Sequence, residues 1–367
     1  MNKFPNKWTL QEVIKLSLIK GLSASKAKEV VDKYSDFTTF IKSDATKKIQ
    51  QLQGDLFNIN DEIVKQADTI ISKCELSKTS IISIWDDEYP KLLKQITYPP
   101  NYIFVKGKLQ ENDSVCIGIV GTRNATVYGK LATERFAEYF AANDIVVVSG
   151  LAHGVDTFAH HATLRAQGVT YAVLASGLDT ISPNVSRKNA EKIVENGGAL
   201  ISEYRCGYLA NLGSFPQRNR IIAGISKAIV VIESGAKGGS LITARLAANE
   251  SRDVFAVPGN ITSEKSEGTN NLIRSNSAIL VNSPSQVLED LGLSGLDLVK
   301  NGSFQRDITF NHPHEENIYN LLTYEPIHID KILDDSGVEI SDGLVRLLEL
   351  EFRGLVKQLP GKYYVKC

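Results

Sequence analysis

Residues 145–179 read IVVVSGLAHGVDTFAHHATLRAQGVTYAVLASGLD, and this stretch decides the class of fold. It opens with an apolar run that ends in Ser149-Gly150, continues as a helix-like segment from Val155, and returns to a second apolar run that ends in Ser176-Gly177. Short apolar runs without polar alternation are typical of strands buried on both faces. A strand, a glycine turn, a helix and a second strand form a βαβ unit, so a parallel sheet is predicted here.

The same alternation of apolar runs and helical segments continues on both sides of this stretch. Strands are predicted at Val115–Val120, Ile145–Val148, Tyr171–Leu174, Ala199–Ile201, Ala228–Ile232, Val254–Val257 and Ala278–Val281, and helices at Val127–Ala142, Val155–Ala166, Ser186–Glu195 and Leu241–Asn249. The predicted fold class is therefore α/β, with a Rossmann-like, doubly wound and mostly parallel sheet that helices cover on both faces. Ligands of such sheets bind at the carboxyl ends of the strands.

Two smaller modules flank this core. Residues 1–78 have apolar side chains at helical spacing and predict a small all-α module, similar to a sterile-alpha-motif or helix-hairpin-helix unit. The glycine turn of this module, within residues 20–27, has two interpretations. Its backbone amides hold a phosphate, or the module serves only for packing. Residues 312–367 give three helices and then two short strands, the pattern of a winged helix. The predicted domains are 1–78, 79–291 and 312–367, with a linker at 292–311.

Charge is distributed unevenly along a chain whose formal net charge is only −1. Residues 1–114 carry 17 basic and 15 acidic side chains and no arginine, whereas residues 115–291 carry 16 basic side chains, ten of them arginine, and 15 acidic ones. Arginine grips phosphate bidentately, so the core is the part suited to nucleic acid, although whole-chain neutrality argues against such a ligand. Residues 312–367 carry six basic and ten acidic side chains. This excess of acid should repel phosphates, so we expect the winged helix to contact protein or to be structural.

Composition excludes several other classes of protein. No apolar run approaches the length of about 20 residues that a membrane helix needs, and the N-terminus lacks the apolar region of a signal peptide. The four cysteines form no C-x-x-C pair. We therefore expect a soluble, cytoplasmic protein with reduced cysteines and no membrane association.

Several predicted strands end in a glycine with a small hydroxyl or basic residue beside it. These turns are Gly121-Thr122-Arg123, Ser149-Gly150, Ser176-Gly177, Ser234-Gly235 to Gly239-Ser240, and Pro258-Gly259. Glycine lets a ligand approach the backbone, and the free amides at a helix start attract anions. A single turn of this kind often serves only as a cap, but five at one edge of a sheet predict a continuous anion-binding groove.

The segment Phe215-Pro216-Gln217-Arg218-Asn219-Arg220 is the other dense basic feature. Pro216 favours a helix start, which would place Arg218 and Arg220 near the sheet edge, and Phe215 could stack on a base. The alternative interpretation is structural: one arginine pairs with Glu203 or Glu233, and Phe215 lies in the core. The sequence leaves both readings open.

Catalytic motifs find no support in the sequence. It contains no G-x-G-x-x-G with an acidic ribose residue, no G-x-x-x-x-G-K-[ST] and no G-x-S-x-G. His153, Asp156 and His160 share a helical face, but no second cluster completes a metal shell, and Asp156 equally suits the first turn of a helix. We therefore predict no catalytic residue, no metal ion and no cofactor.

The chain closely resembles the DNA-processing protein A family (DprA, also called Smf) of bacterial natural transformation, from about residue 80 to 291. The matching segments are Tyr89-Pro90, Leu92-Leu93, Pro99-Pro100, Gly107, residues 120–123, residues 149–156, Ala159-His160, Gly177-Leu178-Asp179, Ser202-Glu203-Tyr204, residues 215–224, residues 239–245, residues 256–259 and residues 268–273. Both flanking modules fit the family's longer architecture. The chain departs from the family at Ser182-Pro183, where Tyr-Pro is usual.

The resemblance implies a single-stranded-DNA-binding recombination mediator without catalytic activity. Such a protein protects single-stranded DNA, loads the recombinase RecA where single-strand-binding protein would compete, and forms a homodimer through its Rossmann-like domain. The residues expected to contact DNA are Gly121, Thr122, Arg123, Gly150, Phe215, Arg218, Asn219, Arg220, Gly239, Ser240 and Thr243, together with Arg187 and Lys188 after the departure at residue 182.

Two alternatives belong to other classes of function. A Rossmann-like nucleotide phosphoribohydrolase, of the lysine-decarboxylase-like kind, has a loop similar to Gly238-Gly239-Ser240. Its catalytic glutamate is missing here, because Leu241-Ile242-Thr243 follow that loop. A transcription regulator acting through the winged helix is disfavoured by the acidity of that module.

Overall fold

The computed structural model describes residues 4, 7–19, 22, 24–44, 46, 61–181, 184–293, 310, 312–323, 326–353 and 355–366. The chain separates into two compact units, one with the N-terminal helices and a large sheet and the other with the C-terminal domain. Lys20, Gly21 and Ser23 of the predicted turn, and most of the predicted linker at 292–311, lie outside the described residues. The domain boundaries therefore stay predictions.

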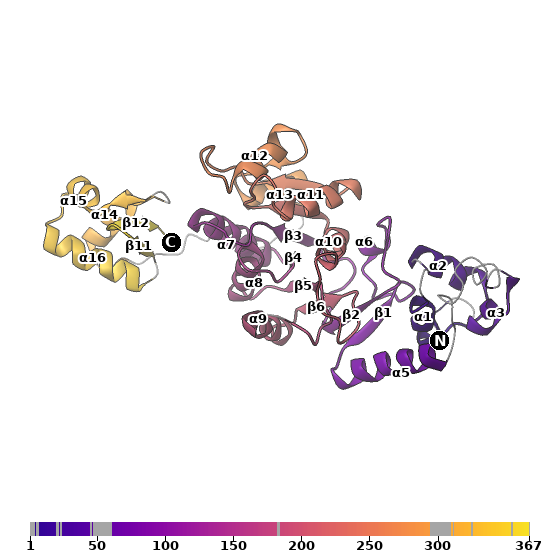
Figure 1. The fold of residues 1–367 in the computed structure, drawn as a ribbon. Helices are drawn as coiled ribbons and strands as arrows, with labels where there is room; N and C mark the ends of the chain where they lie inside the picture. The colour runs from indigo at the N-terminus through magenta and orange to yellow at the C-terminus, as the bar shows by residue number, and fades with distance from the viewer. Residues whose placement is uncertain are drawn as a thin grey trace. The chain divides into compact units, whose positions relative to one another are not determined.

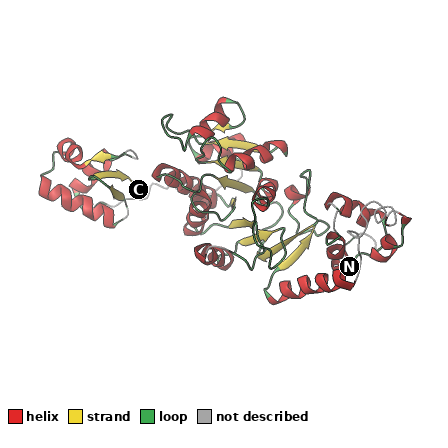
Figure 2. Cartoon of the chain, viewed as in Figure 1, coloured by secondary structure: helices red, strands yellow, loops and turns green. Residues whose placement is uncertain are grey.

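A nine-stranded sheet occupies the centre of the first unit in the described part of the chain, and Figure 2 shows its strands between helices. Its strands are β1 (Ser80–Ser83), β2 (Tyr102–Gly107), β3 (Cys116–Val120), β4 (Val146–Ser149), β5 (Thr170–Leu174), β6 (Ala199–Ser202), β7 (Ala228–Val231), β8 (Asp253–Ala256) and β9 (Ile279–Leu280). They lie in the order β1-β2-β6-β5-β4-β3-β7-β8-β9. Pairing is parallel from β6 to β9 and antiparallel where β2 meets β1 and β6.

This order confirms the predicted Rossmann-like fold. The chain winds outward from β3 through β4 and β5 to β6, and then returns to β7 on the other side of β3. The direction of winding thus changes between β3 and β7, where doubly wound sheets open their ligand crevice. The antiparallel strands β1 and β2 were not predicted, because both precede the region of regular βαβ alternation.

Helices cover both faces of the sheet, as Figure 1 shows. They are α6 (Lys91–Lys94), α7 (Val127–Ala142), α8 (Val155–Arg165), α9 (Asn184–Glu195), α10 (Ser214–Ile225), α11 (Ser240–Asn249), α12 (Glu267–Arg274) and α13 (Pro284–Asp290). Successive side chains of a strand point to opposite faces, so Tyr171 and Val173 of β5 pack with α10 while Ala172 and Leu174 pack with α9. Full burial of such a side chain contributes about 1.5–3 kcal/mol, which is why these strands carry no polar alternation.

The N-terminal helices confirm the predicted all-α module. They are α1 (Leu10–Ser17), α2 (Ala24–Lys33), α3 (Phe37–Ile41) and α5 (Asp61–Leu76), and they share a core around Trp8, Val31 and Phe40. The module also packs on the edge of the sheet. Ile14 joins the cluster around Phe104 of β2, and the hydroxyl groups of Ser17 and Tyr102 are 2.6 Å apart.

The C-terminal domain is the predicted winged helix. Its elements are α14 (Pro313–Leu321), β10 (Ile327–His328), α15 (Ile329–Ser336), α16 (Ile340–Phe352), β11 (Val356–Leu359) and β12 (Tyr363–Lys366), with strand order β10-β12-β11. Ile318, Leu347 and Tyr364 are among its core residues. The first helix starts three residues before the predicted Glu316, because Pro313 suits its first position and His312 caps it. Among the described residues, no helix is long and apolar enough to span a membrane.

Candidate nucleic-acid interface

The loops that follow the parallel strands meet at the carboxyl edge of the sheet, next to the change of winding. The Thr122 amide, after β3, donates to the Glu233 carbonyl after β7 at 2.7 Å. The Thr122 carbonyl accepts from the Val155 amide at the start of α8, at 3.2 Å. A Cβ atom on Gly121 would lie 2.5 Å from Cγ2 of Val155, so glycine is needed there for packing rather than for a ligand. These contacts fix the backbone that presents Arg123.

The turn after β4 is closed by a buried carboxylate. Oδ2 of Asp156 accepts from the amides of Gly150 at 3.2 Å and Ala152 at 3.3 Å. Burial raises the pKa of Asp156, and the charge of Arg218 opposes that rise. The Gly150 amide, predicted to face phosphate, is therefore bonded to a carboxylate of the protein. Asp156 is a structural residue in a first helical turn, which was one of its two readings.

Arg218 is buried, with only 6% of its surface exposed. Its Nη1 donates to the carbonyls of Gly150 and Val173, at 2.5 Å each, and its Nε donates to Oδ1 of Asn219 at 3.0 Å. Burial lowers the pKa of Arg218, and Asp156 opposes that shift. Arg218 therefore ties α10 to the ends of β4 and β5, and it acts as a positioning residue for the edge.

Arg220 makes contacts within the protein, as the structural interpretation of this segment proposed. Its Nη1 donates to the Tyr98 carbonyl at 2.6 Å, and its Nη2 is paired with Glu203. Only 15% of the Arg220 side chain is exposed. Pairing with Glu203 was the alternative left open by the sequence, and the structure shows it.

Arg123 is an exposed arginine of this edge. Its guanidinium lies over the ring of Phe215, 5.3 Å from the centroid. Phe215 is half-buried rather than a core residue, so part of its ring faces outward. A cation stacked on an aromatic ring is suited to a nucleotide, because the cation can take the phosphate and the ring can take the base.

Two stacked tyrosines lie in the loop between β6 and α10. The rings of Tyr204 and Tyr208 are 4.3 Å apart and only 9° from parallel. The Tyr208 carbonyl accepts from the Gly177 amide at 2.9 Å, which ties this loop to the turn after β5. Burial raises the pKa of Tyr204 to about 12. Neither tyrosine was among the predicted contact residues, although two tyrosines four residues apart in a loop after a strand are a usable signal.

The turn after β7 ends at the start of α11. The Ser240 hydroxyl donates to Oγ of Ser234 at 2.9 Å, which fixes this turn. Gly239 is exposed, and no heavy atom lies within 4 Å of a Cβ atom built on it. Thr243 is buried at 2% exposure. Gly239 is therefore the glycine of this turn that a ligand can approach. Ser240 and Thr243 are buried and support the turn from inside the protein.

The predicted contact residues thus divide by exposure. Arg123, Gly239, Arg187 and Lys188 are exposed, the last two on α9. Thr122, Phe215 and Asn219 are intermediate, and Gly121 and Arg220 are largely enclosed. Gly150, Arg218, Ser240 and Thr243 are buried. The first group is therefore the part of the predicted set that is most accessible to a ligand from solvent.

The histidines of α8 do not form a metal site with Asp156. Nδ1 of His160 is 2.7 Å from Oγ1 of Thr170, and Nε2 of His161 is 2.9 Å from Oδ1 of Asn189. Burial lowers the pKa of His160 to about 3. Within the residues that the structure describes, these side chains are not part of a metal-binding group.

The sheet order, the helices on both faces and the C-terminal winged helix place the chain in the class of Rossmann-like proteins, whose ligands bind at the carboxyl ends of the strands. Residues 80–292 match the family model of DNA recombination-mediator protein A, and residues 311–362 match that of the DprA winged helix domain. The chain belongs to the DprA family, as its sequence suggested.

Individual relatives agree with this assignment. Protein Smf of Escherichia coli (strain K12) is 38% identical over 281 residues, which cover 75% of this chain and 74% of the relative. The X-ray structure of DprA from Streptococcus pneumoniae is similar with a TM-score of 0.62 at 33% identity, covering 77% of this chain and 98% of that one. A structure of DprA from Helicobacter pylori, whose title concerns its single-stranded DNA binding mode, has a TM-score of 0.53 at 29% identity and covers 59% and 97%.

Proposed function

We propose that this chain is a recombination mediator that binds single-stranded DNA at the carboxyl edge of its sheet. The observation that carries the proposal is the exposed Arg123 guanidinium over the ring of Phe215, together with the open start of α11 at Gly239. Membership of the DprA family and the single-stranded DNA binding named for the Helicobacter pylori relative support it.

Binding at this edge of the sheet combines charge with stacking. Arg123 takes a phosphate, and backbone amides at the start of α11 take another, because a helix start carries partial positive charge. Phe215 and the pair Tyr204 and Tyr208 offer ring surfaces to unpaired bases. Ring surfaces accept every base, so the binding has little sequence preference. A duplex keeps its bases stacked inside and gains only the phosphate contacts.

A binding assay with matched arginine variants tests this proposal. Arg123→Ala should weaken the binding of a labelled single-stranded oligonucleotide about tenfold, as expected when a charged hydrogen-bonding partner is lost. Arg135→Ala is the control, since Arg135 is also an exposed arginine but lies on α7 away from the helix start. Equal affinity of the two variants would contradict the proposed site.

The proposal extends to partners through the family. It includes a homodimer formed by the Rossmann-like domain, loading of RecA, and competition with single-strand-binding protein during transformation or recombination. The edge strand β9 supports the dimer, because among the described strands it pairs only with β8 and its side chains Ile279 and Leu280 are 46% and 47% exposed. An apolar edge strand of this kind is a natural pairing surface.

We propose a binding role rather than catalysis. The phosphoribohydrolase alternative needs a carboxylate after the glycine loop, and Leu241-Ile242-Thr243 follow that loop instead. Incubation with nucleoside monophosphates should therefore release no free base. Detection of released base would favour the enzyme.

The winged helix is proposed to contact protein rather than duplex DNA. Its α16 takes the place of a recognition helix but exposes an apolar stripe, made of Ile340, Leu344, Val345, Leu348 and Phe352. Arg346 is the basic residue of α16, and it is already paired with Asp342 and Glu349. An apolar and acidic surface has little to offer a phosphate backbone. Tight, salt-sensitive duplex binding would contradict this role.

A further inference from the structure

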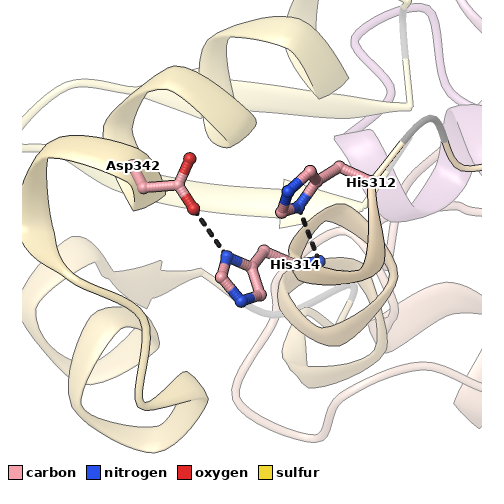
Figure 3. Close-up of side chains that lie close together, drawn as sticks. All are labelled: His312, His314 and Asp342. Atoms are coloured by element: carbon pink, nitrogen blue, oxygen red, sulfur yellow. Dashed lines mark hydrogen bonds and ion pairs between the residues drawn. The ribbon is translucent and has the colours of Figure 1, made fainter.

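We propose that the C-terminal domain binds a divalent transition-metal ion at His312, His314 and Asp342 (Figure 3). His312 caps α14 and His314 is in its first turn, while Asp342 is in the first turn of α16. One donor atom from each residue lies within 4.8 Å of the other two. Two helix starts that are about thirty residues apart in the chain thus bring two imidazoles and a carboxylate together.

Contacts around the three side chains already orient them. Oδ2 of Asp342 is 2.6 Å from Nδ1 of His314, and Oδ1 accepts from Nε of Arg346 at 3.0 Å. Arg346 is held in turn by Glu349 at 2.7 Å. Nδ1 of His312 accepts from the backbone amide of His314 at 3.2 Å. Hydrogen bonds from outer residues of this kind fix the rings and carboxylates of metal sites.

A metal ion can replace the present contacts without leaving a buried group unpaired. Nitrogen and oxygen ligands lie about 2.0–2.2 Å from zinc, so tetrahedral donors are about 3.3–3.6 Å apart. The observed spacing of up to 4.8 Å therefore has to close by about 1.5 Å. The His314 side chain is 47% exposed and can rotate to do so. The ion takes the place of the His314 proton that faces Asp342 and of the long hydrogen bond at His312.

The donor set selects the chemical class of the ion. Two imidazoles and one carboxylate suit Zn²⁺, Co²⁺, Ni²⁺ or Cu²⁺, whereas Mg²⁺ and Ca²⁺ prefer sites made of oxygen. Ten acidic against six basic side chains in residues 312–367 favour a cation, although the nearby Arg346 opposes it. Three protein donors leave at least one position open for water or for a donor from another molecule.

Binding at this site would stabilise the winged helix. The ion would link the start of α14 to the start of α16, two helices that pack against each other. A ligand that binds the folded domain and not the unfolded chain raises its melting temperature in proportion to the logarithm of ligand concentration. The three proposed metal ligands all lie in the winged helix, and none of them is a proposed DNA contact. Binding of single-stranded DNA should therefore be unaffected by the ion.

Titration of the full chain with CoCl₂, without an affinity tag, tests the proposal. One equivalent of Co²⁺ should produce a d–d absorption band of a low-coordinate site, and ZnCl₂ should displace it. His314→Gln and Asp342→Asn should each weaken binding about tenfold or more. Both substitutions keep the size and polarity of the side chain, and circular dichroism verifies that the variants are folded.

A second histidine of the same domain provides the control. His328 also caps a helix, accepting from the Asp330 amide at 3.3 Å, and also pairs with that aspartate, but it has no second histidine beside it. His328→Gln should bind Co²⁺ as the parent chain does. The proposal is overturned if no ion binds, if His314→Gln and Asp342→Asn bind normally, or if a sulfur charge-transfer band that disappears in Cys206→Ser places the ion on cysteine. The three side chains would then form only a helix cap and an ion pair.

Discussion

Arg218 holds the ends of two strands, whereas Arg123 lies on the ring of Phe215 in contact with solvent. Arg218→Ala would leave Asp156 buried without its countercharge and would remove the donor that Nη1 supplies to two carbonyls. Breaking a buried charge pair from one side costs about 3–5 kcal/mol of unfolding free energy. Arg123→Ala removes an exposed side chain and should change stability by no more than about 0.5 kcal/mol.

Urea unfolding of the two variants measures this difference. If Arg218→Ala is as stable as Arg123→Ala, the buried arginine is not the structural tie that its hydrogen bonds indicate.

His160 makes the stability of the folded chain depend on pH. Burial lowers its pKa to about 3, from an ordinary value of 6.5. Between these values the unfolded chain binds a proton that the folded chain does not, so stability is lost as the pH falls through this window, by up to about 1.4 kcal/mol per pH unit. The raised pKa of Asp156 acts in the opposite direction.

The variant His160→Asn isolates the histidine, since it can keep a hydrogen bond to Thr170 but cannot titrate. Urea unfolding at pH 7 and pH 5 should show a smaller loss of stability in the variant than in the parent chain. Equal losses would mean that His160 is protonated in the folded state.

Gly239 and Gly154 should respond differently to an added methyl group. Gly154 has a φ of 77°, and a Cβ atom built on it would lie 2.4 Å from the carbonyl oxygen of Thr122. Gly154→Ala should therefore lower the free energy of unfolding by about 1–3 kcal/mol. Gly239→Ala meets no atom and should leave the melting temperature nearly unchanged. Gly239→Ala should nevertheless weaken the binding of single-stranded DNA about tenfold, if a phosphate accepts hydrogen bonds from the amides at the start of α11. Unchanged affinity would show that no phosphate comes so close.

At this scale the sequence predicted residue types better than their roles. It identified the arginines, glycines and Phe215, because glycine turns after strands and a proline-led helix have recognisable chemistry. It could not separate Arg123 from Arg218, because exposure depends on how α10 packs over β4 and β5. The pairing of Arg220 with Glu203 joins residues from different elements and was only one of two open readings.

The elements of the core were predictable because each is buried in a characteristic pattern. Residues 127–142 form α7 with the predicted bounds, and the predicted strands all occur with ends shifted by no more than two residues. The strands β1 and β2 were missed, since they pair antiparallel and precede the regular βαβ alternation. The helix expected from Pro216 begins at Ser214.

The edge strand β9 gives a test of the proposed homodimer. Leu280→Lys places a charge on an exposed apolar edge and should shift the chain from dimer to monomer, because buried like charges face each other across a symmetric contact. Sedimentation velocity measures the change, with Ile261→Lys as the control, since Ile261 is 94% exposed in a loop. A dimer that persists in Leu280→Lys would place the contact on another surface.

For the whole molecule, a net charge of −1 is a sum over unlike parts. Residues 312–367 carry ten acidic against six basic side chains, whereas the exposed cations Arg123, Arg187 and Lys188 lie in the Rossmann-like unit. Near-neutrality therefore limits long-range attraction to DNA but not local contacts in a groove. Modest affinity for duplex DNA follows, because duplex binding rests on long-range charge.

The salt dependence of single-stranded DNA binding tests the central claim most directly. Fluorescence anisotropy over a range of salt concentrations gives the slope of log K against log salt, which is about −0.7 for each phosphate contact with a single strand. The account predicts tighter binding of a single strand than of a duplex, and a slope about 0.7 shallower in Arg123→Ala than in Arg135→Ala. A salt-independent affinity, or equal slopes for the two variants, would contradict the claim that this edge of the sheet binds DNA.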